Sequence, residues 1–120
     1  MAGKRLPVVF ASRFTTYAGG GDFPTVALDL ADYESAVIHV WRGMLVGSMP
    51  SFGVTFEEST DSITWTTCSG TTAEADPGQQ TEVPYMVTLG KRFVRVRVSL
   101  GGANTVASCY AYGHLVRRQH

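Results

Sequence analysis

Apolar and polar residues alternate with a period of two along much of the chain, most clearly in two stretches. In residues 92–100 the valines and a leucine share one face, while Arg95, Arg97 and Ser99 share the other. Residues 52–65 alternate in the same way on both sides of a polar turn. A strand with one apolar and one polar face is typical of an antiparallel sheet. We therefore predict that these two stretches form the centre of a β-structure, the second as a hairpin.

The same period predicts further strands, which turn residues separate. The expected strands are 7–17, 25–30, 35–42, 54–57, 63–68, 83–89, 92–100 and 105–116. We find no segment with the apolar stripe of a helix. About eight antiparallel strands predict an all-β fold, a jelly-roll-like β-sandwich that forms one domain over residues 1–120.

Two local details follow from this reading. Gly101-Gly-Ala-Asn104 favours a hairpin turn between the last two strands, because glycine and asparagine tolerate positive φ. We also expect Trp65 to be buried against the facing sheet, so that Trp65→Ala would be among the most destabilising substitutions.

The net charge and the first residues of the chain limit the partners and the compartment that we expect. The 10 basic and 10 acidic residues balance, so we expect neither nucleic acid nor a membrane surface as a partner. No run approaches the roughly 18 apolar residues of a membrane span, and the first residues lack the apolar core of a secretory signal. We expect synthesis in a cytoplasm. Cys68 and Cys109 could form a disulfide if their strands are neighbours, although two buried thiols are favoured in a reducing compartment.

Candidate chemistry is sparse. Glu74, Asp76 and Glu82 could bind calcium through their carboxylates, but their spacing matches no calcium loop. His39 and Trp41 could form a ligand platform, although packing partners are the favoured interpretation. No nucleophile, acid pair or zinc spacing matches a catalytic or metal motif, so we predict no enzyme, no cofactor and no metal.

Two segments resemble known proteins. Residues 56–65 resemble the Glu-x-Ser-x-Asp-Gly-x-x-Trp hairpin of discoidin-like and carbohydrate-binding jelly rolls and of small virion proteins of tailed bacteriophages. Ser62 stands where the glycine is usual, which predicts a longer turn. Residues 93–98, the following glycines and residues 110–118 look like the C-terminal hairpin of phage structural proteins.

The phage resemblance implies a head decoration or cement protein on the outer capsid surface. Such a protein clamps adjacent copies of the major capsid protein and is often a homo-oligomer, with a trimer favoured. We expect its contacts in the terminal segments 1–6 and 115–120 and in the loop 43–50. The candidate contact residues are Lys4, Arg5, Leu6, Met44, Leu45, Val46, Met49, Arg117 and Arg118.

Two alternatives stay open. One is a carbohydrate-binding module, in which exposed rings such as Trp41, Tyr85, Tyr110 or Tyr112 stack on pyranose rings. The other is a different virion component, such as a tail or head-fibre protein, which would share the fold but contact different neighbours.

Overall fold

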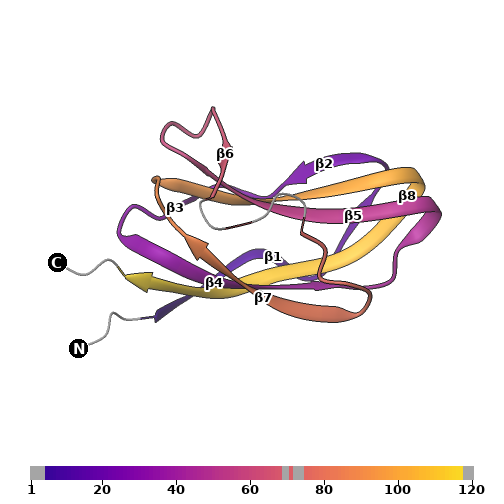
Figure 1. The fold of residues 1–120 in the computed structure, drawn as a ribbon, viewed down its shortest axis with the longest axis horizontal. Coiled ribbons are helices and arrows are strands. Elements are labelled where there is room, and N and C mark those ends of the chain that lie inside the picture. Colours follow the sequence, from indigo (N-terminus) through magenta and orange to yellow (C-terminus); the bar gives the residue numbers. More distant parts are fainter. Residues whose placement is uncertain (1–4, 69–70, 72–74, 118–120) are drawn as a thin grey trace.

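The computed structural model describes residues 5–68, 71 and 75–117, and the side chains of all of these except residues 5, 6, 13 and 14. Within these residues, the chain forms eight strands that pair in antiparallel fashion (Figure 1). They are β1 (Arg5–Ala18), β2 (Gly21–Pro24), β3 (Leu28–Asp29), β4 (Tyr33–Arg42), β5 (Val46–Ser59), β6 (Thr66–Thr67), β7 (Thr81–Thr88) and β8 (Phe93–Arg117). The predicted all-β class is confirmed. In the described part of the chain, no helix has the length and apolar character needed to cross a membrane.

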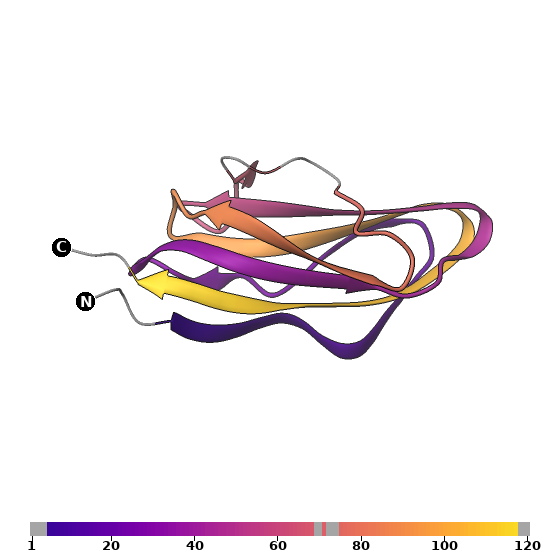
Figure 2. The same cartoon turned by 60° about the horizontal axis from the view of Figure 1, so that its bottom comes forward.

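Strand β8 organises the sheet. The strands β1, β2 and β3 follow one another along one edge of β8, and β4 and β5 follow one another along its other edge. Strand β7 pairs with β4, and β6 pairs with β5. This sheet folds over on itself, so that its strands form two packed layers (Figures 1 and 2). The first layer holds β2, β3, β5, β6 and the first half of β8, and the second layer holds β1, β4, β7 and the second half of β8.

Strand β8 passes from the first layer to the second at the predicted turn, residues 101–104. Gly102 and Asn104 have positive φ values of 95° and 56°, and the chain reverses direction there as expected (Figure 1). The predicted hairpin is nevertheless wrong, because the two halves of β8 pair with β5 and β4 rather than with each other. The turn carries the chain from one layer into the other.

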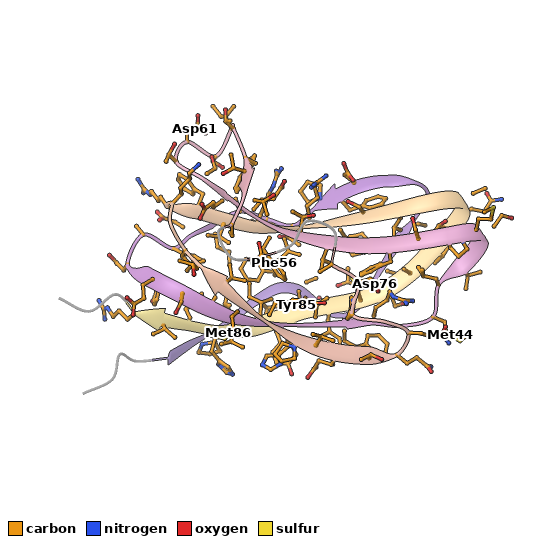
Figure 3. All side chains as sticks on the ribbon, in the orientation of Figure 1. Met44, Phe56, Asp61, Asp76, Tyr85 and Met86 are labelled. Atoms are coloured by element: carbon orange, nitrogen blue, oxygen red, sulfur yellow. The ribbon has the colours of Figure 1, made fainter. Side chains whose placement is uncertain are left out.

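The core lies between the layers and comes from one face of each strand. In the first half of β8, Val94, Val96, Val98 and Leu100 are 0%, 1%, 1% and 4% exposed, which confirms the predicted alternation. In β5, Phe56 is fully buried, and its ring centroid lies 5.3 Å from that of Tyr85 in β7 of the other layer (Figure 3). These contacts join the two layers.

The expected burial of Trp65 is wrong. Its ring is half-buried on the outside of the first layer, where the Arg95 guanidinium carbon lies 4.2 Å from the ring centroid. The cause is the long turn after β5, in which the Asp61 carboxylate accepts the N–H groups of Ile63 and Thr64 at 2.8 and 2.9 Å. This turn keeps the returning chain outside the core, and the prediction of a longer turn is confirmed.

Both cysteines are buried free thiols. The Cys68 N–H donates to the Phe56 carbonyl at the edge of the first layer, and Cys109 lies in the second layer opposite Arg42. Burial raises the pKa of each thiol to about 12. The favoured interpretation, two buried thiols, is confirmed.

Candidate functional site

Four ring side chains gather on the outer surface of the second layer, because β4 and β8 pair in register. His39 lies opposite Tyr112 and Trp41 opposite Tyr110. The His39 and Tyr112 rings stack with centroids 5.3 Å apart, and the Trp41 and Tyr110 rings stack at 5.4 Å. Strand β4 thus turns Ala36, Ile38, Val40 and Arg42 inward and these rings outward, which the sequence had left open.

A single carboxylate holds both tyrosines in place. The Tyr110 hydroxyl donates to Glu82 Oε1 at 2.6 Å, and the Tyr112 hydroxyl donates to the same atom at 3.2 Å. The His39 Nδ1 atom lies 3.7 Å from Glu82 Oε2. Because β4 lies between β8 and β7, the tyrosines must reach across β4 to meet Glu82. We call the set His39, Trp41, Glu82, Tyr110 and Tyr112 the aromatic face.

A groove of about 380 Å³ opens beside the tyrosines, on the side of β1. Val9, Ala11, Ser12, Tyr110 and Tyr112 line it. The pairing of β1 with β8 shifts on both sides of Ala11, and Thr15 Oγ1 donates to the Ser12 carbonyl at 2.6 Å within the irregular segment. A bulge of this kind bends an edge strand away from its neighbour, which accounts for the space beside the rings.

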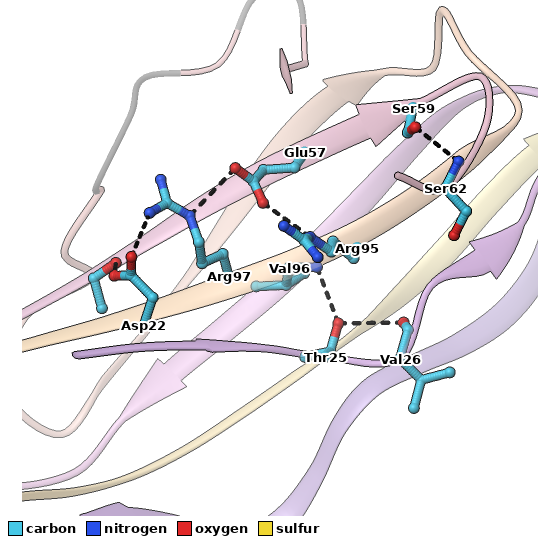
Figure 4. A network of polar contacts seen from close by, with 10 residues as sticks. Asp22, Thr25, Val26, Glu57, Ser59, Ser62, Arg95, Val96 and Arg97 are labelled. Carbon is cyan, nitrogen blue, oxygen red and sulfur yellow. Dashed lines mark hydrogen bonds and ion pairs between the residues drawn. The ribbon is translucent and has the colours of Figure 1, made fainter. Parts of the chain in front are cut away.

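The outer surface of the first layer has a different character. Glu57 in β5 is 8% exposed, and its carboxylate forms ion pairs with the side chains of Arg95 at 2.9 Å and Arg97 at 3.2 Å (Figure 4). Asp22 in β2 accepts from Arg97 at 3.0 Å and from Ser99 at 2.8 Å. The Ser99 hydroxyl, followed by the Arg97 guanidinium, lowers the pKa of Asp22. We call these five residues the ionic face.

An exposed apolar group lies where the layers join. Met44, Val46 and Met49 are 57%, 59% and 93% exposed, and Val106, which is 37% exposed, pairs with Val46. We call these four residues the apolar tip. Leu45, which was predicted beside them as a contact residue, instead packs against the core.

The backbone at the apolar tip is closely packed. A Cβ atom on Gly47 would lie 2.8 Å from the Ala103 carbonyl oxygen, and one on Gly102 would lie 2.6 Å from the Met49 carbonyl oxygen. Both glycines have φ values that favour glycine, 138° and 95°. Met49 has a φ of 48°, which is uncommon for a residue with a side chain.

The predicted contact segments fall at two opposite ends. Arg5 pairs with Val116, so the terminal strands lie side by side, and Arg117 is exposed next to them. The loop 43–50 lies at the other end of a molecule that measures 50 × 28 × 21 Å (Figures 1 and 3). Lys4 and Arg118 lie outside the described residues, and nothing is described of the side chains of Arg5 and Leu6.

Other candidates are reassigned by their contacts. Asp76 pairs with Arg42 at 3.0 Å and Glu82 holds the tyrosines, while Glu74 lies outside the described residues. Within residues 5–68, 71 and 75–117, no group of three or more histidine, cysteine or acidic residues could hold a metal ion. Tyr85 packs on Phe56 and is therefore not part of the aromatic face.

Sequence reasoning missed the roles of Glu82, Val9 and Ser12. Glu82 was considered with its neighbours in the chain, whereas its partners come from β8. Tyr110 and Tyr112 lie two residues apart, so a strand places both rings on the same face. This spacing could have predicted that the two rings lie side by side.

No family model and no curated protein matches the sequence. Solved structures do match. The VP2 protein of infectious bursal disease virus in derived T=1 particles gives a TM-score of 0.61 at 8% identity over 95% of this chain and 32% of VP2. The VP2 subviral particle of the same virus gives 0.60 at 9% identity, with the same coverage. The CBM22-1 xylan-binding domain of Paenibacillus barcinonensis Xyn10C gives 0.49 at 15% identity over 98% of each chain.

The chain therefore spans about a third of the VP2 chains that it matches. At identities of 8% and 9% this likeness shows the fold alone. The protein has the β-sandwich, jelly-roll-like fold that also occurs in this viral capsid protein.

Proposed function

We propose that this protein is a structural component of a tailed-phage virion, a head decoration or cement protein that binds the major capsid protein on the outer capsid surface. The resemblance of residues 93–98, the following glycines and residues 110–118 to phage structural proteins supports this role. Residues 56–65 resemble small phage virion proteins as well as carbohydrate-binding jelly rolls, and a jelly-roll-like fold is compatible with the role. The role is structural rather than catalytic, and a homo-oligomer, with a trimer favoured, would suit repeated capsid sites.

The apolar tip is the observation that carries the proposal. Exposed methionines adapt to a partner surface, and Met49 is 93% exposed. A non-glycine residue in the left-handed region costs on the order of 1–2 kcal/mol, so the backbone around Met49 must hold it there. The close approach of Gly47 and Gly102 to the facing backbone provides that support. A rigid support lowers the entropy that binding would cost.

The length of the molecule supports a clamp. The terminal strands and the apolar tip lie at opposite ends of the 50 Å axis, so each end can contact a different neighbour (Figure 1). Two weak contacts joined by a rigid body bind far more tightly than either contact alone.

Sedimentation of a native lysate through a density gradient tests the role. We expect the protein in a particle of megadalton size beside an abundant capsid protein. Its copy number relative to that protein distinguishes decoration, with many copies, from a tail or head fibre, with few. Recovery solely at the top of the gradient would contradict a virion role.

Rebinding to particles that lack the protein tests the apolar tip. We expect Met44→Ser/Met49→Ser to weaken binding at least about tenfold, or about 1.4 kcal/mol. Ile63→Ser is the control, because Ile63 is 81% exposed in the turn after β5, away from the tip. Equal binding by the two variants would remove the apolar tip from the interface.

A further inference from the structure

We propose that the groove beside Tyr110 and Tyr112 binds a pyranose ring of a neutral saccharide. This inference goes beyond the capsid role and does not depend on it. It rests on the position of two tyrosine rings, on the polar groups around them and on the bulge in β1 that opens the groove.

The two rings are held before any ligand arrives. Tyr110 stacks on Trp41, Tyr112 stacks on His39, and both hydroxyls donate to Glu82. A tyrosine that is fixed in this way loses little side-chain entropy on binding. The hydroxyl bonds draw both side chains toward β7, while the same rings line the groove on the side of β1. The rings therefore form a prepared wall for a flat ligand.

The lining of the groove is amphiphilic. Tyr110, Tyr112, Val9 and Ala11 offer apolar surface, and the Ser12 hydroxyl lies among them. A pyranose ring has a face of C–H groups and a rim of hydroxyls, so it can stack on a ring and donate or accept at the rim. The Ser12 hydroxyl lies 3.3 Å from Thr15 Oγ1 and has capacity for a further hydrogen bond, which a sugar hydroxyl can use and a purely apolar ligand cannot.

Charge and size favour a neutral sugar. An anion would be repelled by Glu82, and that carboxylate already accepts two tyrosine hydroxyls, so it is a weak anchor for a cation. The volume of about 380 Å³ lies near the lower end of the range for small-molecule sites, roughly 300–1,000 Å³.

Titration of the intact protein with soluble hexasaccharides, followed by the amide signals in NMR spectra, tests the proposal. The probes are maltohexaose, cellohexaose, mannohexaose and chitohexaose at millimolar concentration. We expect at least one of them to shift the amides of residues 9–12 and 110–112 in a saturable way. If none of the four shifts these amides, or if the shifts lie elsewhere, the proposal is overturned.

Variants decide whether the rings carry the binding. We expect Tyr110→Ala and Tyr112→Ala each to raise the Kd at least about tenfold, and Ser12→Ala to raise it about twofold to threefold. Tyr110→Phe keeps the ring and should retain most of the affinity, which separates stacking from a folding defect. Trp65→Ala is the matched control, because it removes a half-buried ring from the first layer. If Trp65→Ala weakens binding as much as Tyr110→Ala does, the groove is not the site.

The groove could instead face a protein. In that case the amides of residues 9–12 would be protected on capsid particles, and the hexasaccharides would leave them unchanged. That pair of results would overturn the saccharide proposal and assign the groove to the capsid interface.

Discussion

The ionic face and the aromatic face each include residues of β8, and they differ in how their side chains are partnered. On its inward side, β8 carries valines in the first half and Ala107, Cys109 and Ala111 in the second. On the outward side, the first half carries Arg95 and Arg97, and the second half carries Tyr110 and Tyr112. The inward residues therefore form core in both halves of β8, whereas the outward residues are charged in the first half and aromatic in the second.

The charged side chains of the ionic face form ion pairs with one another. Glu57 meets two arginines, and Asp22 meets Arg97 and Ser99, so two acids and two bases balance across three strands (Figure 4). Because its residues come from β2, β5 and β8, this network links three neighbouring strands through their side chains.

The aromatic face has one carboxylate, and a bulge in β1 leaves space beside its rings. The ion pairs link the strands of the first layer, whereas the second layer carries the groove that we propose as a saccharide site.

The largest effect should come from the core that both faces share. We expect Phe56→Ala to lower the free energy of unfolding by about 3–5 kcal/mol, because a fully buried ring that joins the layers is lost. Trp65→Ala should cost about 1 kcal/mol, since the ring is half-buried over Arg95. Urea unfolding of both variants measures the contrast. Equal losses would mean that Trp65 belongs to the core after all.

The next effect should separate the two faces. We expect Glu57→Gln to cost about 1–3 kcal/mol, because it leaves two half-buried arginines without their carboxylate. Glu82→Gln should cost under about 1 kcal/mol, since an amide oxygen still accepts from the tyrosine hydroxyls. Urea unfolding in low salt is the measurement. A larger loss for Glu82→Gln would reverse the assignment of the stabilising face.

Each layer contains one buried thiol, so the two cysteines can be used to measure the packing of the two layers separately. Since the pKa of Cys68 and Cys109 is raised to about 12, the fold favours the neutral thiol. This contribution is fully present below the ordinary thiol pKa of about 8.5 and is lost as the pH rises toward about 12. Urea midpoints should therefore fall between these pH values, and serine substitution of both cysteines should reduce the fall. A midpoint that rises with pH over this range would contradict buried thiols.

Reaction with a disulfide reagent at neutral pH sharpens the same contrast. We expect both thiols to react at least about a hundredfold more slowly in the native protein than in urea, because reaction requires an opening of the structure. Mass spectrometry of the labelled peptides identifies which layer opens first. Rapid labelling of Cys109 without denaturant would indicate that the second layer is loosely packed.

The smallest effect on stability should come from the apolar tip. Met49→Asn places a residue that tolerates positive φ at 48°, so the free energy of unfolding should stay unchanged or rise by up to about 1 kcal/mol. Capsid binding should weaken, because an exposed apolar side chain is removed. Thermal unfolding and particle rebinding measure the two effects. A variant that binds as well as the parent would show that the Met49 side chain does not contribute.

The sequence predicted what depends on local alternation. The inward row from Val94 to Leu100 follows from a period of two, and the turn at residues 101–104 follows from its glycines and Asn104. The strands that pair with the segments on either side of that turn could not be predicted, because the local sequence does not distinguish a hairpin from a connection between the two layers. Strand β4 was ambiguous for the same reason, since both of its faces carry apolar residues.

The aromatic face could be predicted in part. Trp41, Tyr110 and Tyr112 stood out as rings, but their assembly with Glu82 depends on the register of β7, β4 and β8. Trp65 was misplaced because the Asp61 turn is longer than a tight hairpin turn. The strand register is set by contacts distant in the sequence, which one chain alone does not reveal. The longer turn was predicted from Ser62, but its effect on the position of Trp65 was not.

Hydrogen exchange of the protein, free and bound to capsid particles, tests the central claim most directly. We expect slower exchange on the particle at residues 43–50 and in the paired terminal strands near Arg5 and Val116. Exchange at the ionic face, residues 95–99, should stay the same. Protection of the ionic face with unchanged exchange at both ends would contradict the proposed clamp.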